Sequence, residues 1–162
     1  MKTCVFAGTF DPFSKGHEYI VDKCLDLFDE VVIAIGVNVD KKPMFSLDER
    51  KQIILAKYSN DKRVRVCSFE GMLVDFMKKE NIIHTIRGIR DEGDYKYESV
   101  MAKYNEDLFP EVVSIFIPTP NELSYISSTA VRNIIKLGSD FSKYIPKESV
   151  ETINNIIKTR KK

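Results

Sequence analysis

Five short apolar runs divide the first 118 residues, and they constrain the fold more than any other feature of the sequence. They are rich in β-branched residues, and most are apolar at successive positions, which is typical of strands covered on both faces. The runs are "TCVFAG" at 3–8, "EVVIAIGV" at 30–37, "RVRVCSF" at 63–69, "IIHTIRG" at 82–88 and "VVSIFIP" at 112–118.

The segments between these runs have helical spacing. Ile20, Cys24 and Phe28 recur at every fourth position, and Ser46 with Glu49 forms a capping box before the next helix. Further helices are predicted at about 72–80, 128–136 and 147–159, and another helix carries Tyr97, Met101, Tyr104 and Leu108 on one face and ends before Pro110. Because strands and helices alternate, the sequence predicts one α/β domain over 1–162, with a five-stranded, mainly parallel sheet and helices on both faces.

Composition narrows the class of protein. The formal net charge is +1, so broad attraction to nucleic acid or to an anionic membrane is not expected. The three cysteines lie in apolar surroundings without Cys-x-x-Cys spacing, as in a reduced intracellular protein. We therefore expect a cytoplasmic protein.

The stretch "GTFDPFSKGH" at 8–17 follows the first apolar run, where a parallel sheet commonly binds its ligand. Gly8 and Gly16 allow close approach of the backbone, Thr9 offers a hydroxyl, and His17 falls in the first turn of the next helix. A helix start with free N–H groups favours a phosphate. A simple turn with a surface histidine remains the alternative, because neither G-x-G-x-x-G nor the Walker lysine pattern is present.

Two later stretches carry residue types that bind phosphate. "YISSTAVR" at 125–132 places three hydroxyls at a predicted helix start, although capping alone needs one. "RGIRDEGDYKYE" at 87–98 places Arg87 and Arg90 at the end of the fourth run, with Lys41 and Lys42 at the same predicted edge. Paired arginines suit phosphate oxygens; the alternative is solvated charge beside Asp91 and Glu92.

Together with "KKPMFSLDER" at 41–50, these stretches resemble the bacterial phosphopantetheine adenylyltransferases, of the nucleotidyltransferase superfamily with a His-x-Gly-His-type loop. The resemblance runs from Thr3 to about Pro146 and implies a Rossmann-like fold. It implies transfer of the adenylyl group of ATP to 4′-phosphopantetheine, giving dephospho-coenzyme A and pyrophosphate. It also implies Mg²⁺, feedback by coenzyme A and a hexamer.

The resemblance assigns roles to residues that match the motifs. His17 would stabilise the transition state. The phosphopantetheine contacts would be Thr9, Lys41, Leu73 and Arg87. The ATP contacts would be Thr9, Phe10, His17, Gly88, Ile89, Arg90, Glu98, Leu123, Ser124, Tyr125, Ile126, Ser127, Ser128 and Thr129. Three positions depart from the family pattern, at Ala7, Ser14 and Leu123, and they put the loop geometry and the adenine contact in question.

The expected chemistry needs few kinds of residue. A phosphate monoester is already anionic, so its attack on the α-phosphate requires alignment and charge neutralisation rather than a strong base. Magnesium would be held mainly by the ATP phosphates and water, with no protein metal site. The alternatives are a sister enzyme, such as a nicotinate mononucleotide adenylyltransferase or a glycerol-phosphate cytidylyltransferase, and a non-catalytic nucleotide-binding protein.

Two further features are interpreted structurally. His84 alternates with apolar residues and is expected to be a packed or interface histidine. Tyr95, Tyr97 and Tyr104 share a predicted helix and are expected in the core or at a subunit contact.

Overall fold

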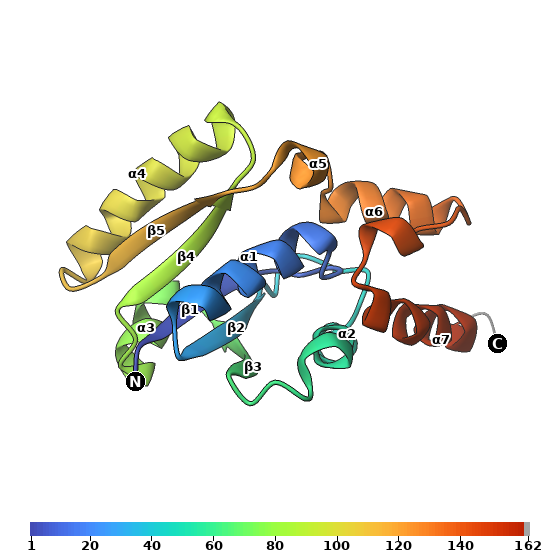
Figure 1. Cartoon of the computed structure of the whole chain (residues 1–162), viewed down its shortest axis with the longest axis horizontal. Coiled ribbons are helices and arrows are strands. Elements are labelled where there is room, and N and C mark those ends of the chain that lie inside the picture. The colour runs from blue at the N-terminus through green and yellow to red at the C-terminus, as the bar shows by residue number, and fades with distance from the viewer. Residues whose placement is uncertain (161–162) are drawn as a thin grey trace.

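The computed structural model describes residues 1–160, so the last two residues of the predicted domain lie outside it. Within this range, five parallel strands form one sheet in the order β3-β2-β1-β4-β5 (Figure 1). The strands are β1 (Thr3–Gly8), β2 (Glu30–Val37), β3 (Val64–Glu70), β4 (His84–Ile89) and β5 (Val113–Pro118). The predicted α/β class is confirmed.

Helices connect the strands and complete the chain. They are α1 (Lys15–Leu27), α2 (Leu47–Tyr58), α3 (Leu73–Glu80), α4 (Glu92–Leu108), α5 (Asn121–Ser124), α6 (Ser128–Lys136) and α7 (Val150–Arg160), with 3₁₀ turns at Ser142–Tyr144 and Lys147–Ser149. Helix α4 ends before Pro110 as predicted, and it begins at Glu92 because the carboxylate of Asp91 caps it, accepting the Asp94 N–H at 2.8 Å. The single turn α5 was not predicted, since one turn is too short to show a helical period.

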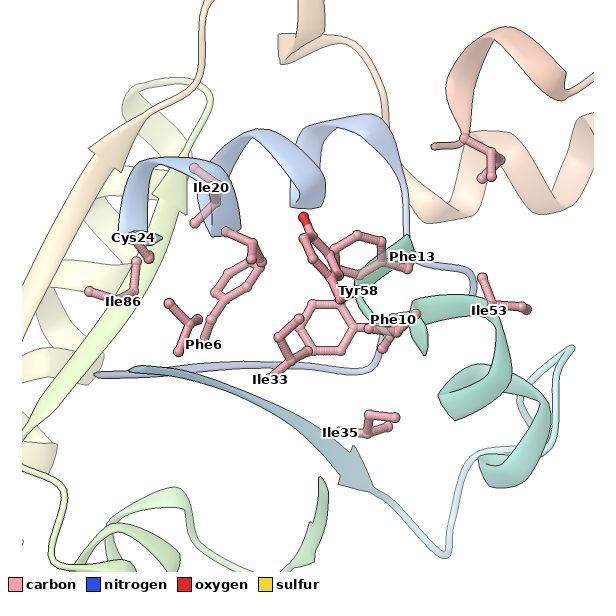
Figure 2. Close-up of a cluster of buried hydrophobic side chains, with 14 of the residues drawn as sticks. Phe6, Phe10, Phe13, Ile20, Cys24, Ile33, Ile35, Ile53, Tyr58 and Ile86 are labelled. Atoms are coloured by element: carbon pink, nitrogen blue, oxygen red, sulfur yellow. The ribbon is translucent and has the colours of Figure 1, made fainter. Parts of the chain in front are cut away.

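The sheet is buried on both faces, as predicted. One core joins Phe6 and Ile33 of the sheet to buried residues of α1, α2, α6 and α7. The other joins Val5 and Val32 to α3 and to the segment that follows α4. Figure 2 shows Phe6, Phe10 and Phe13 beneath α1, between that helix and β2. Neighbouring residues of one strand thus serve opposite cores, which explains why the runs are apolar at every position.

Helix α4 has no buried residue among those described, so a core role for its tyrosines is wrong. Tyr97 and Tyr104 are 64% and 59% exposed, because α4 lies beside the edge strand β5 and only one of its sides meets the sheet (Figure 1). The subunit-contact interpretation remains.

The strand order reverses direction between β1 and β4. The chain proceeds from β1 through β2 to β3 on one side, and then returns to place β4 on the other side of β1. A crevice therefore opens beyond the carboxyl ends of β1 and β4, which is where open α/β sheets bind ligands.

No helix in residues 1–160 combines the length and apolar character that crossing a membrane requires.

Candidate functional site

A pocket of about 370 Å³ lies at this reversal of strand order. It is enclosed by the end of β1, the loop that follows, the start of α1, the end of β4 and the segment from Thr119 to α6. The residues predicted for the site that line it are Thr9, Phe10, His17, Arg87, Gly88, Arg90, Glu98, Leu123, Ile126, Ser127, Ser128 and Thr129. Stretches separated by more than a hundred residues therefore meet in one place.

Other predicted residues lie outside the pocket lining. Lys41 is exposed on the loop between β2 and α2, and Leu73 begins α3, where it packs against the second core. Three predicted residues are sequence neighbours of residues that line the pocket: Ile89, Ser124 and Tyr125. The ring of Tyr125 packs edge to face with the ring of Tyr144, with 6.4 Å between the centroids. Their roles in ligand binding stay predictions.

The loop after β1 turns on Phe10, whose φ of 50° lies in the left-handed region. This conformation costs a residue with a side chain roughly 1–2 kcal/mol, so the loop must be held by other contacts. The Phe10 ring is 2% exposed and lies over Gly8, where an added Cβ would come within 3.0 Å of it. Gly8 is therefore needed to make room for the ring.

Charged and polar groups fix the same loop from two sides. The carboxylate of Asp11, 4% exposed, accepts the backbone N–H groups of Met44 and Phe45 at 2.8 Å each. From α6, Arg132 Nη1 donates to Asp11 O at 2.7 Å, and Ser128 Oγ donates to Pro12 O at 2.8 Å. The loop is thus connected to the segment before α2 and to α6.

His17 lies in the first turn of α1, among the rings of Phe10 and Phe13, whose centroids are 5.0 and 5.4 Å away. Its Nδ1 accepts the Ser14 backbone N–H at 3.0 Å. A backbone N–H can only donate, so Nδ1 carries no proton and the proton of the neutral ring lies on Nε2. Ser14 Oγ also lies 3.1 Å from Nδ1, but the bond from the backbone N–H is enough to fix the tautomer and does not depend on which side chain stands there.

Burial, together with the smaller effects of the positive charges of Arg90 and Arg87, lowers the pKa of His17 to about 4. The ring is therefore neutral at pH 7, and its Nε2–H is a hydrogen-bond donor without a positive charge.

Arg87 and Arg90 are each paired with a carboxylate of α4. Arg87 donates from Nε and Nη2 to Glu98 at 2.9 and 2.7 Å, and from Nη1 to Ala7 O at 2.8 Å. Arg90 Nε donates to Asp94 at 2.9 Å, and this pair holds the pKa of Asp94 below its ordinary value. Arginine has five N–H donors, so the Arg87 guanidinium keeps donors for a ligand while its plane is fixed.

Each hydroxyl at the start of α6 has a partner within the protein. Ser127 Oγ accepts the Ala130 N–H at 3.1 Å, Ser128 binds the loop, and Thr129 Oγ1 accepts from Arg132 Nη2 at 3.1 Å. The three hydroxyls therefore have structural roles, in capping α6 and in binding the loop and Arg132.

The pocket also contains residues that were not assigned from the sequence, chiefly Asp11, Asp94, Thr119 and Arg132. Asp11 and Arg132 stand inside the quoted stretches, where a charge next to a glycine-rich turn or a helix start is a usable signal. Asp94 also stands inside a quoted stretch, next to Gly93 at the start of α4, whereas Thr119 gave no such signal because only the tertiary fold brings it to the pocket.

Comparison with known proteins shows which family this chain belongs to. The cytidylyltransferase-like family model matches residues 5–134. A phosphopantetheine adenylyltransferase from Heliobacterium modesticaldum is 40% identical over 146 residues, 90% of this chain and 87% of the relative. The phosphopantetheine adenylyltransferase from Clostridium perfringens strain SM101 is 39% identical over 160 residues, 97% of this chain and 96% of the relative. The chain belongs to the phosphopantetheine adenylyltransferase family.

A solved structure supports the fold of this family member independently. The nicotinic acid mononucleotide adenylyltransferase of Plasmodium falciparum, complexed with NaAD, superimposes with a TM-score of 0.67 at 20% identity, and the match covers 96% of each chain. At this identity the likeness extends to the Rossmann-like fold alone.

The neutral His17 is directly testable in the ligand-free protein. We expect its ring to titrate near pH 4 rather than near the ordinary value of about 6.5, with the proton on Nε2 above that pH. The folded state then binds fewer protons than the unfolded state between these values, so this group weakens the fold as pH falls through that window.

Long-range ¹H–¹⁵N NMR of the imidazoles measures both properties. The chain has two histidines, so the spectrum of a His17→Gln variant assigns the signals. A midpoint at or above 6.5, or a proton on Nδ1 at neutral pH, would contradict this description of the site.

Proposed function

We propose that this chain transfers the adenylyl group of ATP to 4′-phosphopantetheine, producing dephospho-coenzyme A and pyrophosphate. The observation that carries the proposal is the identity of 39–40%, over at least 90% of the chain, to bacterial proteins that bear the name of this activity. The pocket supports it chemically, because its arginines and histidine suit a ligand with several phosphates.

The pocket would act by alignment. The ATP phosphates would lie over the start of α1, where backbone N–H groups and the helix dipole favour anions. His17 Nε2–H would donate to the α-phosphate and bind it more strongly as charge develops in the transition state. Holding the two anions in line could contribute about 7–11 kcal/mol to lowering the barrier.

The two arginines would divide the substrates. Arg87, with Thr9, Lys41 and Leu73, would bind phosphopantetheine. Glu98, proposed on the ATP side, would also fix the Arg87 guanidinium, a role supported by the two hydrogen bonds between these side chains. Arg90 would bind ATP, and the other ATP contacts are proposed for Thr9, Phe10, His17, 88–89 and 123–129.

Magnesium would bind through the substrate. The carboxylates of the pocket already have partners: Asp11 accepts backbone amides, and Asp94 and Glu98 are paired with arginines. In the described residues 1–160 there is no cluster of three or more carboxylate, histidine or cysteine side chains suited to a metal ion. This donor set fits an ion held by ATP oxygens and water, which would neutralise phosphate charge.

Location and assembly are proposed in the same way. We place the protein in the cytoplasm, where ATP is present and free cysteines persist. Coenzyme A contains the dephospho-coenzyme A portion of the product, and we propose that it competes with the substrates for the pocket. We also propose a hexamer in which α4 meets a neighbouring subunit. The exposed Tyr97, Met101 and Tyr104 of α4 support such a contact.

A substrate panel tests the activity. ATP or CTP is offered with phosphopantetheine, nicotinate mononucleotide or glycerol phosphate, and pyrophosphate release is measured. We expect ATP with phosphopantetheine to give the highest turnover, and mass spectrometry to identify dephospho-coenzyme A. Faster reaction with nicotinate mononucleotide would favour the sister enzyme, and no release with any pair would favour a non-catalytic binding protein.

Sedimentation analysis tests the assembly. The parent should sediment as a hexamer, and Tyr104→Glu, which places a charge in the proposed contact, should shift the protein to smaller species. Leu137→Glu is the matched control, because Leu137 is also exposed, at 82%, but lies at the end of α6. A monomeric parent, or equal masses for the parent and Tyr104→Glu, would reject this contact.

A further inference from the structure

A buried arginine lies directly beneath the phosphate-binding loop. Arg50 stands in the first turn of α2 and is 4% exposed. A guanidinium removed from water is costly unless other groups compensate for its charge and hydrogen bonds. None of the roles proposed above uses Arg50, so the burial calls for an explanation.

The contacts of Arg50 point to the loop. Its Nη1 donates to the carbonyl oxygen of Thr9 at 2.8 Å, and makes a longer contact of 3.5 Å with Gly36 O in β2. Burial lowers the pKa of Arg50, and the nearby carboxylate of Asp11 opposes this by favouring the charged form. Its Nε is buried without a hydrogen-bond partner within residues 1–160. The position that brings Nη1 to Thr9 therefore leaves another donor of the same side chain unsatisfied.

The bond to Thr9 sets the orientation of one peptide group. In a trans peptide the C=O and the following N–H point in opposite directions. With the Thr9 carbonyl directed at the buried guanidinium, the Phe10 N–H is turned toward the opposite side, where Thr9 and Phe10 line the pocket. Within residues 1–160 this N–H makes no hydrogen bond to the protein, so it is available to a ligand.

The bond also acts where the backbone is strained. Phe10 has its φ at 50°, and a relaxed loop would return it to negative φ, which would rotate the same peptide group. Arg50 holds the peptide from inside the protein, while Arg132 holds Asp11 O from α6. The strained residue is therefore fixed on both sides.

We propose that Arg50 is a positioning residue for phosphate binding: it holds the Thr9 carbonyl inside the protein and thereby presents the Phe10 N–H to the ATP phosphates. This inference rests on the proposed function, since it takes ATP as the ligand. Arg50 does not contact the ligand, and acts through the backbone of Thr9 and Phe10.

Two substitutions separate positioning from filling of space. Arg50→Met keeps an unbranched buried side chain but removes every donor, and Arg50→Lys keeps a charge and a donor. We expect Arg50→Met to retain its melting temperature as well as or better than Arg50→Lys, because it buries no charge. We expect the opposite order for turnover. The turnover of Arg50→Met should fall about a hundred-fold because the loop is misplaced, and the turnover of Arg50→Lys should lie between those of Arg50→Met and the parent.

Ser149→Ala provides the control for stability. Ser149 is 0% exposed and its Oγ donates to Ile53 O at 2.7 Å, so the variant loses a buried hydrogen bond to α2 without touching the loop. Its melting temperature should fall while its turnover stays at the parent level. Turnover that follows melting temperature across the three variants would overturn the positioning role.

Calorimetric titration with ATP and Mg²⁺ distinguishes failure of this inference from failure of the proposed function. We expect ATP affinity at least ten-fold weaker for Arg50→Met than for the parent, whichever acceptor the protein uses. If the parent gives no adenylyl transfer, the proposed function fails while the titration still tests Arg50. Equal affinities for the parent and Arg50→Met overturn the role of Arg50 alone. If Arg50→Met does not fold, Arg50→Leu, which likewise removes every donor, is titrated, and parent affinity there overturns the role.

Discussion

The site depends on the left-handed turn at Phe10, which directs the loop after β1 across the end of the sheet. An isolated chain would not keep this conformation, because it is unfavourable for a residue with a side chain. The protein retains it by burying the Phe10 ring in the core and by fixing the neighbouring carbonyls with Arg50 and Arg132. Loop geometry is thus a consequence of packing, and it is set before any ligand arrives.

The charged side chains around the pocket are also held in place by contacts within the protein. Arg87 and Arg90 are oriented by Glu98 and Asp94, and the two arginines in turn help to keep His17 neutral. A site whose donors are already oriented need not reorganise when phosphate charge moves in the transition state. Nothing in this arrangement requires a nucleophilic side chain, since the attacking phosphate supplies the nucleophile.

Much of this fold could be predicted from the sequence, because its sheet is covered on both faces and its strands are therefore continuous apolar runs. The bounds of β1 and β2 match the runs at 3–8 and 30–37. The sequence did not define the start of α4, and it did not show that the tyrosines of this helix are exposed, because that exposure depends on which elements pack beside the helix. In the site, residue types and strand ends indicated which stretches meet. The links between them, such as Arg50 to Thr9 across 41 positions, need the tertiary structure.

Steady-state kinetics of His17→Ala test the central claim, that this preformed loop holds a neutral histidine for the transition state. The matched control is His84→Ala, because His84 begins β4 at the opposite end of the sheet, where its Nδ1 lies 3.2 Å from Thr3 O. Loss of one well-placed donor to developing charge costs about 2.7–4 kcal/mol, so His17→Ala should lose roughly a hundred- to a thousand-fold in turnover at saturating substrates, with a small change in ATP affinity. His84→Ala should keep parent turnover. A raised Michaelis constant for ATP, with turnover of His17→Ala within a few-fold of the parent, would contradict the account.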